Sequence, residues 1–583
     1  MWIYGTFTWH PYFSYMRPGT LLNHCVLAAA ICGAFSLKAQ TASCRRPAPG
    51  SVVAEPKQVR SSYGVLELDL NFKNMRDAEG QEEYCYQSSN GERSPTLRVQ
   101  PGDRLVLHLK NSLKLEPTAA NRAPHSMGMP IESPCADGQL TASSTNLHFH
   151  GLSIPPSCGQ DDVMRTAISP KNSPFTYNLT IPVDQPPGLY WYHPHLHGLT
   201  NAQVSGGGSG AIVIEGIERA NRLVAGMHER TLAIRDQYLI HPNSQQTGPG
   251  LTPPVFRDAE GDILNTGTGG GKPSRDLSIN FVPVPWPDYP PAKILSRPND
   301  RQLWRVLNAS SLTFLDLQIV VAGKPQSIGV VALDGVPIDE NGMTPDRIFW
   351  TDHVFLPPAA RAEFIVKGMP AGTRAQFITR SVDTGPAGEN DPVRPLADVV
   401  VTDQAPDLVA LPSSPDSMVR PSQIWIGNIQ PARTRKLYFS ERPSDPNRTD
   451  SPTVFMLTVE GKLPAPFNPH QAEPDIVARQ GDVEDWVIEN RSTEAHAFHI
   501  HQVHFMLTQW NGVAVDEPFM RDTINVPYWR GPGTPYPSIT LRMDFRDPSV
   551  VGTFMYHCHL LEHEDGGMMG VLRVLPRTDD RIH

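Results

Sequence analysis

The sequence has little excess charge and, beyond its N-terminal region, no long run of apolar residues. Its 50 lysines and arginines stand against 60 aspartates and glutamates, which gives a formal net charge of −10 over 583 residues. No basic stripe runs along the chain, so a nucleic-acid partner is not expected. No segment after the N-terminal region predicts a transmembrane helix. A hydrophobic fraction of 39% is nevertheless enough to build real cores.

Near the N-terminus an apolar run, Leu21–Leu37, follows Arg17. It is short for a membrane span, and Leu37-Lys38-Ala39 at its end resembles a cleavage site. The pattern predicts an export signal over residues 1–39, with Met16 as an alternative start, and therefore a periplasmic or extracellular protein. No twin-arginine pair precedes the run, which favours the general export route. Cys44 is a poor match to a lipid attachment site, and anchoring stays open.

Cysteine is scarce, with seven in the whole chain. Four of them, Cys85, Cys135, Cys158 and Cys558, lie clearly beyond the predicted signal, and Cys44 lies at its margin. An oxidising compartment would allow two of Cys85, Cys135 and Cys158 to form a disulfide. The sequence does not determine which cysteines pair, Cys44 included. Cys558 lies in a different context, between two histidines.

Proline and glycine are abundant, at 58 and 45 residues, which favours turns and short strands over long helices. Three segments have the same length, and each begins with Asp and ends with Asn: Asp103–Asn111, Asp300–Asn308 and Asp482–Asn490. The even spacing of these segments predicts three copies of one β-domain. We expect the domains at residues 50–218, 219–405 and 406–583.

A second repeat relates the first and third domains. Gly188–Leu196 aligns without gaps onto Gly552–Leu560, and the shared residues include the glycine, a tyrosine, two histidines and the leucine. The aromatic alternation is typical of β-sandwich strands. The first and third domains are therefore predicted to share a His-x-His site. The middle domain lacks it, because no histidine follows Asn308 at the corresponding place.

Histidines gather in four clusters, and imidazole is the commonest metal ligand in proteins. One His-x-His pair would more often be two strand residues without a metal, but four in sister positions indicate metal binding. The clusters are His148-Phe-His150, His193-Pro-His195-Leu-His197, His496-Ala-Phe-His499-Ile-His501, and His557-Cys558-His559 followed by His563 and Met568.

The fourth cluster is the most specific. His496, Cys558, His563 and Met568 supply two imidazoles, a thiolate and a thioether, which is the ligand set of a blue copper electron-transfer site. Met569 is the alternative to Met568. Alternate side chains of a strand face opposite sides, so His557 and His559 should point away from Cys558 towards a second metal centre. Electrons accepted at the thiolate would then have a short route to metals that pass them to O2.

These motifs resemble those of the multicopper oxidase family, which includes laccases, bilirubin oxidases and bacterial cuprous oxidases. The resemblance covers essentially the whole chain after the predicted signal. It implies an all-β protein of three cupredoxin-like Greek-key β-sandwiches, with a trinuclear copper cluster between the first and third domains. It also implies four copper ions, with these ligands: type 1, His496, Cys558, His563 and Met568; type 2, His148 and His499; type 3 pair, His150, His193, His195, His501, His557 and His559.

The resemblance also implies acidic residues that supply protons for reducing O2 to water. Glu564, directly after His563, matches one such position, and Asp161 is favoured over Asp162 for the other. Glu494, two residues before His496, is either a binding group for the electron donor or an ordinary loop charge. His197 and His504 match no ligand position and are interpreted as supporting residues.

The predicted function is a laccase-like oxidase, in which four one-electron oxidations of a phenol or aromatic amine reduce O2 to water. A metallo-oxidase acting on Cu(I), Mn(II) or Fe(II) is the alternative. The 17 methionines are scattered rather than gathered in an insert suited to Cu(I), which favours the laccase-like hypothesis. A non-enzymatic relative would have lost ligands, and all twelve predicted ligands are present. A copper nitrite reductase would lack the paired histidine clusters.

Overall fold

The structure is a computed structural model, and it describes residues 44–114, 134–135, 140–244, 271–338, 346–413, 425–448, 451–471, 473–517 and 519–577. The predicted export signal, residues 1–39, lies outside the described residues. Strands make up most of the regular structure, and the described helices are short: α1 (Thr200–Ser205), α2 (Ile217–Ala220) and α3 (Leu561–Asp565), with 3-10 turns at Arg222–Val224, Ile426–Asn428 and Pro548–Val550. No described helix is long and apolar enough to cross a membrane.

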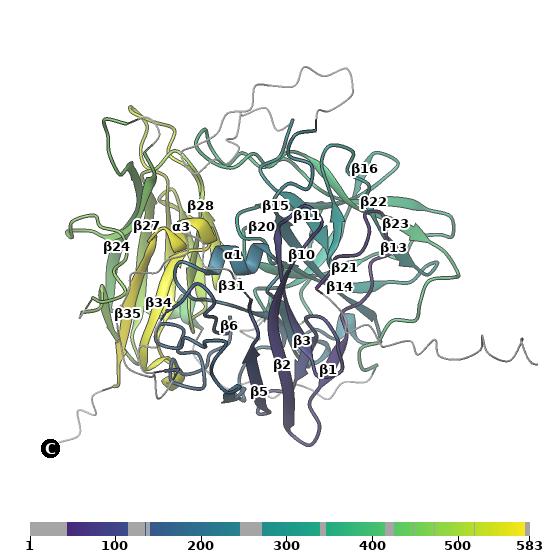
Figure 1. The fold of residues 1–583 in the computed structure, drawn as a ribbon, viewed down its shortest axis with the longest axis horizontal. Helices are drawn as coiled ribbons and strands as arrows, with labels where there is room; N and C mark the ends of the chain where they lie inside the picture. The colour runs from purple at the N-terminus through teal and green to yellow at the C-terminus, as the bar shows by residue number, and fades with distance from the viewer. Residues whose placement is uncertain are drawn as a thin grey trace, which may run out of the picture. The chain divides into compact units, whose positions relative to one another are not determined.

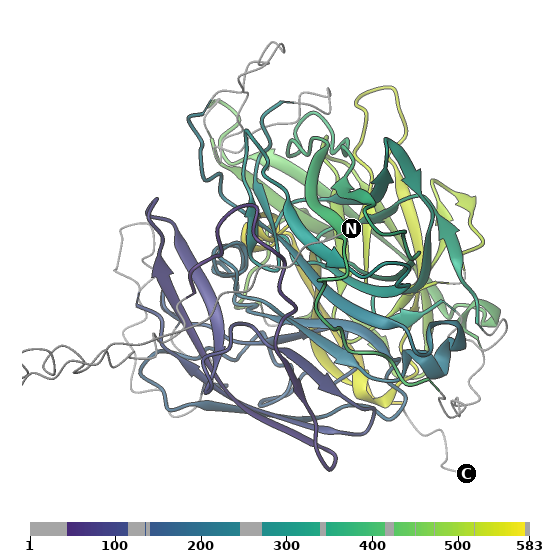
Figure 2. The ribbon, with the colours of Figure 1, turned by 90° about the vertical axis from the view of Figure 1, so that its right-hand side faces the viewer.

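The first sandwich packs the sheet β3-β2-β5-β7 against the sheet β1-β4-β9-β8-β6. In Figures 1 and 2 its strands are purple to blue. They are β1 (Gln58–Arg60), β2 (Val65–Arg76), β3 (Glu82–Ser88), β4 (Thr96–Val99), β5 (Arg104–Asn111), β6 (His148–His150), β7 (Phe175–Thr180), β8 (Gly188–His193) and β9 (Gly210–Ile214).

The middle sandwich combines the sheet β12-β11-β10-β14-β21-β17-β18, with β19 beside β17, and the sheet β13-β23-β22-β15-β16, with β20 beside β15. Its strands are β10 (His228–Gln237), β11 (Asp276–Ile279), β12 (Val282–Val284), β13 (Ala292–Ser296), β14 (Gln302–Asn308), β15 (Leu315–Val321), β16 (Lys324–Gln326), β17 (Ile328–Leu333), β18 (Val336–Pro337), β19 (Phe349–Thr351), β20 (Val354–Leu356), β21 (Arg361–Val366), β22 (Arg374–Thr379) and β23 (Arg394–Val401).

The third sandwich combines the sheet β25-β24-β27-β33-β29-β30, with β31 beside β29, and the sheet β26-β35-β34-β28-β32. Figure 1 shows its strands in green to yellow. They are β24 (Arg433–Pro443), β25 (Thr453–Val459), β26 (Ile476–Arg479), β27 (Val483–Asn490), β28 (His496–Ile500), β29 (Phe505–Trp510), β30 (Val513–Ala514), β31 (Met520–Arg521), β32 (Thr523–Val526), β33 (Ser538–Asp544), β34 (Gly552–Cys558) and β35 (Met569–Leu575). The predicted class, three β-sandwiches, is confirmed; the exact domain boundaries stay predictions.

The threefold sequence repeat corresponds to three equivalent strands. β5, β14 and β27 each pair in parallel with an earlier strand, namely β2, β10 and β24. The fifth residue of each repeat, Leu107, Trp304 or Trp486, is at most 1% exposed and belongs to the core of its own sandwich. Each sandwich thus has a separate core built around the same strand.

The second repeat corresponds to two sister sheets. In the first sandwich β4, β9, β8 and β6 are neighbours in that order, and in the third β26, β35, β34 and β28 are. The strand directions agree as well. In each sheet the first two strands of this order are parallel, and the next two pairings are antiparallel. Corresponding strand pairs of the two sheets, β6 with β8 and β28 with β34, carry the histidine motifs.

Two disulfides join described cysteines, Cys44–Cys85 and Cys135–Cys158. The second disulfide joins two of the three cysteines, Cys85, Cys135 and Cys158, among which a pair was expected. The first adds Cys44, whose sulfur is bonded to Cys85 and therefore unavailable for a lipid thioether. Among the cysteines that the structure describes, Cys558 is the free one, and it is buried.

Candidate metal centre

The first sandwich presents four histidines from one edge of its sheet. His148 and His150 lie on β6, His193 ends β8, and His195 follows it. His148 is the cross-strand partner of His193, so their rings lie on one face of the sheet, 5.2 Å apart between centroids. The period of two in a strand places His148 and His150 on that same face.

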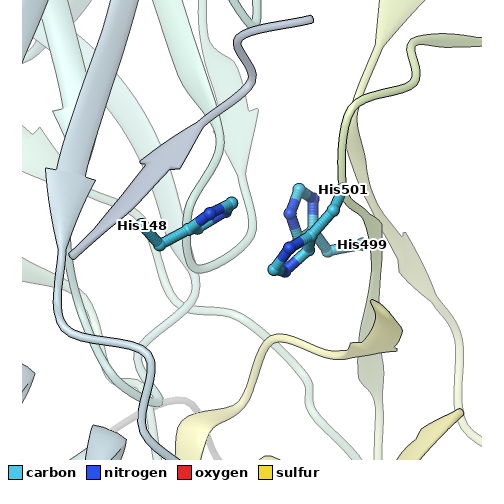
Figure 3. A group of neighbouring side chains, drawn as sticks. All are labelled: His148, His499 and His501. Atoms are coloured by element: carbon cyan, nitrogen blue, oxygen red, sulfur yellow. The ribbon is translucent and has the colours of Figure 1, made fainter. Parts of the chain in front are cut away.

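The third sandwich presents a matching set. His499 lies on β28 directly opposite His557 on β34, and His501 and His559 follow the ends of these strands. Their rings face those of the first sandwich. His148 stacks on His501 with 4.0 Å between ring centroids, and His150 stacks on His499 with 3.9 Å. Figure 3 shows His148 of the first sandwich pointing toward His499 and His501 of the third. We call these eight residues, His148, His150, His193, His195, His499, His501, His557 and His559, the imidazole cluster.

Within the cluster, ring nitrogens of several histidines point toward one another at short distances. The Nε2 atoms of His195, His501 and His557 lie 3.1, 3.2 and 3.3 Å from one another. Two further triplets have nitrogen atoms within 4.8 Å of one another, namely His148 with His499 and His501, and His148 with His150 and His193. Several metal ions are therefore expected to share this space.

Protein groups determine which nitrogen of each ring faces inwards. The Nδ1 of His148 contacts both oxygens of Asp161 at 2.9 and 3.0 Å, and the Nδ1 of His499 contacts the Asp522 carbonyl at 2.8 Å. The Nδ1 of His193 likewise contacts the Pro194 carbonyl at 2.8 Å. The Nε2 of each of these rings is buried and has no hydrogen-bond partner among the described residues. Outer contacts of this kind orient metal-binding histidines.

His150 has the opposite orientation. Its Nε2 lies 3.2 Å from Oδ1 of Asp522, and its buried Nδ1 has no hydrogen-bond partner among the described residues. Both nitrogens of the buried His559 also lack such a partner. A buried polar atom without a partner costs about 1–3 kcal/mol. Metal coordination would satisfy these nitrogens, so the residues present fit metal ions.

Burial also keeps these rings neutral, which is the form that binds metals. It lowers the pKa of His193 to about 3 and that of His557 to about 4, in both cases mainly by desolvating the charged form. The same desolvation lowers the pKa of His148, His150 and His499 well below the ordinary value. At neutral pH the lone pairs are therefore available for metal ions.

The second group of ligands, which we call the thiol site, comprises His496, Cys558, His563 and Met568. The Sγ of Cys558 lies 3.6 Å from Nδ1 of His496 and 3.8 Å from Nδ1 of His563. The two Nδ1 atoms are 3.3 Å apart. Burial raises the pKa of the Cys558 thiol to about 12, so the thiolate forms only beside a strong positive charge. Two imidazoles and one thiol at these distances fit a copper ion.

The two neighbouring methionines lie in different surroundings. Met568 is fully buried in the apolar cluster that contains Cys558, and its carbonyl accepts the Cys558 amide at 3.0 Å. Met569 packs with Val163 and Met555 in a separate apolar cluster. The choice of Met568 as the thioether ligand is supported by this placement.

The two acids proposed for proton supply are buried beside the imidazole cluster. Asp161 is 1% exposed, and besides His148 it accepts the Phe149 amide at 2.9 Å. Its neighbour Asp162 is half-buried. Glu564, on α3, places Oε2 3.2 Å from Nδ1 of His557 and Oε1 3.7 Å from Nδ1 of His195. Desolvation raises the pKa of both carboxyls well above the ordinary value.

Glutamates cover the outer edge of the thiol site. Oε1 of Glu494 lies 3.4 Å from Nε2 of His563, and Oε1 of Glu441 lies 3.0 Å from Nε2 of His496. The Ser492 hydroxyl is also 2.7 Å from that Nε2. Glu494 is thus buried against a predicted ligand and is not an ordinary loop charge. Sequence reasoning missed Glu441, because it lies on β24, more than fifty residues before the histidine motif and outside every repeat.

Sequence reasoning also missed Asp522, which lies between β31 and β32, and Arg361 and Asp334 of the middle sandwich, all of which support the imidazole cluster. No motif surrounds them. The one sequence feature that points to them is Gly151, the glycine after His150, because Arg361 and Asp522 pack against it. His197 and His504 lie beside the site, as expected of supporting residues. The His197 ring packs against Phe467, and Nε2 of His504 contacts the Asp334 carbonyl at 3.2 Å.

Comparisons with known proteins agree with this site. Two family models, both described as multicopper oxidase, match residues 139–219 and 443–578. The multicopper oxidase mco of Staphylococcus aureus is 22% identical over 487 residues, which cover 82% of this chain and 81% of that protein. A laccase of Haloferax volcanii is 23% identical and covers 75% of this chain and 68% of that protein.

Solved structures share the fold. A multicopper oxidase from Campylobacter jejuni, described as a metallo-oxidase, superimposes with a TM-score of 0.61 at 23% identity, covering 91% of this chain and 96% of that one. The matched segments contain the imidazole cluster and the thiol site, and the relatives span most of the chain. The chain therefore contains two segments that match the multicopper oxidase family, residues 139–219 and 443–578, and these segments carry both candidate sites.

Proposed function

We propose that the protein is a copper oxidase that couples four one-electron oxidations of a donor to the reduction of O2 to water. The observation that carries this proposal is the run His557-Cys558-His559, which belongs to both sites. Cys558 faces the thiol site, and His557 faces the imidazole cluster. Bound copper would supply the one-electron chemistry at the first site and the collection of electrons for O2 at the second.

Four copper ions would fill the two sites. The thiol site would hold a type 1 copper through His496, Cys558, His563 and Met568. His148 and His499 would hold a type 2 copper. The remaining six histidines of the imidazole cluster would hold a type 3 pair, with the converging Nε2 atoms of His195, His501 and His557 on one ion.

Reduction of O2 consumes protons, and Glu564 and Asp161 are proposed to hold them. Burial raises the pKa of the Glu564 carboxyl well above its ordinary value, which favours a held proton next to the imidazole cluster. Asp161 borders the other side, between the Nδ1 atoms of His148 and His501, which lie 2.9 and 3.9 Å from its oxygens.

The donor is proposed to be a phenol or an aromatic amine that approaches the edge of His563. This ring is 6% exposed, whereas His496 and Cys558 are completely buried. Phe455 stacks on the His563 ring with 4.3 Å between centroids, and Phe439 lies 4.7 Å from that of His496. An aromatic donor would meet the exposed edge of the His563 ring, which Phe455 supports from its other side.

A metal-ion donor is the second candidate, and the glutamates at the same edge favour it. Ligand atoms of Glu441, Glu494, His496 and His563 lie within 4.8 Å of one another. Carboxylate oxygens suit Mn(II) and Fe(II), whereas Cu(I) prefers sulfur. A divalent donor bound here would contact both imidazoles of the thiol site.

One experiment tests the proposed activity and separates the two donor classes. O2 uptake by copper-loaded protein is measured with a methoxyphenol, with Fe(II), with Mn(II) and with stabilised Cu(I), in the native chain and in Glu441→Gln/Glu494→Gln. We expect uptake with the phenol in both proteins. If metal ions are donors, their rate should fall at least tenfold in the double variant.

Glu460→Gln, which changes a half-exposed glutamate on the same sandwich, is the matched control and should leave every rate unchanged. Fully copper-loaded protein that consumes no O2 with any donor would contradict the proposed function. Hydrogen peroxide as the main product would contradict the four-electron reaction.

We further propose that the protein is exported and receives copper outside the cytoplasm. The disulfides Cys44–Cys85 and Cys135–Cys158 support an oxidising compartment. Fractionation of expressing cells tests this. Folded, copper-loaded protein confined to the cytoplasm would rule it out.

A further inference from the structure

We propose that the middle sandwich, which supplies none of the predicted copper ligands, positions the imidazole cluster through Arg361. This role rests on the function proposed above: Arg361 would hold two ligand rings in place and would not itself bind copper. Arg361 is a positioning residue in this scheme, and it acts through Asp522.

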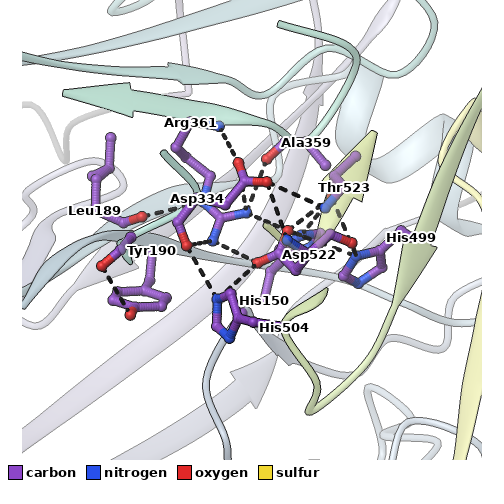
Figure 4. A network of polar contacts seen from close by, with 12 residues as sticks. His150, Leu189, Tyr190, Asp334, Ala359, Arg361, His499, His504, Asp522 and Thr523 are labelled. Carbon is purple, nitrogen blue, oxygen red and sulfur yellow. Dashed lines mark hydrogen bonds and ion pairs between the residues drawn. The ribbon is translucent and has the colours of Figure 1, made fainter. Parts of the chain in front are cut away.

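Arg361, at the start of β21, contacts all three sandwiches (Figure 4). Its Nε donates to the carbonyl of Leu189 on β8 of the first sandwich at 3.1 Å. Its Nη2 donates to the carbonyl of Asp334 in the middle sandwich at 2.9 Å. In the third sandwich its Nη1 and Nη2 each donate to one oxygen of Asp522 at 2.7 Å. The planar guanidinium matches this carboxylate bidentately, which a lysine ammonium cannot do.

Asp522 transmits this constraint to two rings of the imidazole cluster. Its Oδ1 lies 3.2 Å from Nε2 of His150, and its carbonyl accepts from Nδ1 of His499 at 2.8 Å. These contacts leave Nδ1 of His150 and Nε2 of His499 without partners among the described residues. Because the two rings come from different sandwiches, one residue sets the relative orientation of ligands on both sides of the cluster.

The support is buried and rigid. Arg361 and Asp522 are completely buried, and Asp334 is 2% exposed. Asp334 accepts the Arg361 amide at 2.8 Å, and its other oxygen accepts the amides of Asp522 and Thr523 at 3.2 Å. Side chains and backbone of the network thus hold each other, so the position of the Asp522 carboxylate has little freedom.

Gly151 provides an independent observation. It follows His150 with φ 85°, and a Cβ there would lie 2.5 Å from Nη2 of Arg361 and 2.6 Å from Oδ2 of Asp522. The Arg361–Asp522 pair therefore packs directly on the backbone next to a ligand. A glycine is required at this motif position by both the left-handed backbone and the ion pair.

The test compares Arg361→Lys, Arg361→Met and Asp522→Asn with the native protein. Copper content, blue absorption and the electron paramagnetic resonance signal of type 2 copper are measured, together with O2 uptake. We expect normal blue absorption and normal anaerobic reduction of the thiol-site copper by the donor. The type 2 signal should shift or weaken in every variant, and O2 uptake should fall at least tenfold.

Arg305→Lys is the matched control, because Arg305 is an equally buried arginine of the middle sandwich that pairs with Glu229 and Glu363 instead. A merely structural role predicts that Arg361→Lys and Arg305→Lys lose stability alike and keep the native type 2 signal, and that result would overturn the proposal. If Arg361→Met does not fold, the lysine and asparagine variants decide. Native protein that binds no copper would instead refute the proposed function itself.

Discussion

At the scale of single residues, the central feature is that Cys558 points to the thiol site, whereas the histidines on either side of it, His557 and His559, belong to the imidazole cluster. The Sγ of Cys558 contacts the Nδ1 atoms of His496 and His563, while His557 contacts His501 of its own sandwich and His195 of the first sandwich. The thiol is completely buried and belongs to the apolar core of the third sandwich. Its sulfur therefore serves one site only, and its removal should spare the other.

Cys558→Ser should abolish the blue colour and donor oxidation, because a serine hydroxyl does not replace a thiolate on copper. Copper in the imidazole cluster should remain, since none of its ligands changes. Absorption near the blue band, donor oxidation and total copper are measured together. A Cys558→Ser protein that is still blue and active would refute the ligand assignment.

At the scale of elements, each repeat strand ends in an asparagine that organises the loop after it. The amide of Asn111, Asn308 or Asn490 donates to one or two loop carbonyls, and its carbonyl accepts the amide two residues further on. In the third sandwich that loop carries Ser492 and Glu494 and leads to His496. The repeated asparagine is therefore a loop anchor, and in this sandwich it anchors a ligand.

Asn490→Ala should cost about 1–3 kcal/mol of stability, because the buried Glu494 carbonyl and Ser492 amide lose their partner. It should also shift the blue absorption, because the loop next to His496 moves. Asn308→Ala is the matched control: it should lose comparable stability in chemical denaturation yet keep the native spectrum. Identical spectra in both variants would show that this loop does not place His496.

At the scale of the whole molecule, the imidazole cluster is divided between the first and third sandwiches. Arg361 connects the middle sandwich to it through Asp522. Rings that meet in the imidazole cluster thus come from distant parts of the chain, 362 residues apart in the His195–His557 contact. Metal ions bound here would tie the sandwiches together. Folding and metal binding are then thermodynamically linked.

Copper loading should therefore raise Tm by several degrees. A metal present at one hundred times its Kd and bound only by the folded state contributes about 2.7 kcal/mol per site. Calorimetry of metal-free and copper-loaded protein measures the shift, and a chelator should reverse it. The Cys558→Ser variant should show a smaller rise, and equal Tm values with and without copper would mean that the sites do not form in the folded protein.

The sequence by itself determined the three repeats, the sister relation of two of them and the residues proposed as ligands. These features are local, since strand periodicity and residue spacing carry them: β5, β14 and β27 lie where the repeat predicts them, and the four histidine clusters lie on or directly after corresponding strands of the sister sheets. It also singled out Asp161 and Glu564, which follow ligand motifs closely along the chain.

Only the tertiary structure decided how distant segments meet. The pairing of Cys44 with Cys85, the glutamate Glu441 beside His496, and the Arg361–Asp522 pair behind His150 join residues that no motif connects. Their physical reason is burial: once the sandwiches pack, charges and ring nitrogens removed from water must find partners wherever the fold brings them. Sequence spacing describes one strand at a time, whereas these partners are set by how strands, sheets and sandwiches pack against one another.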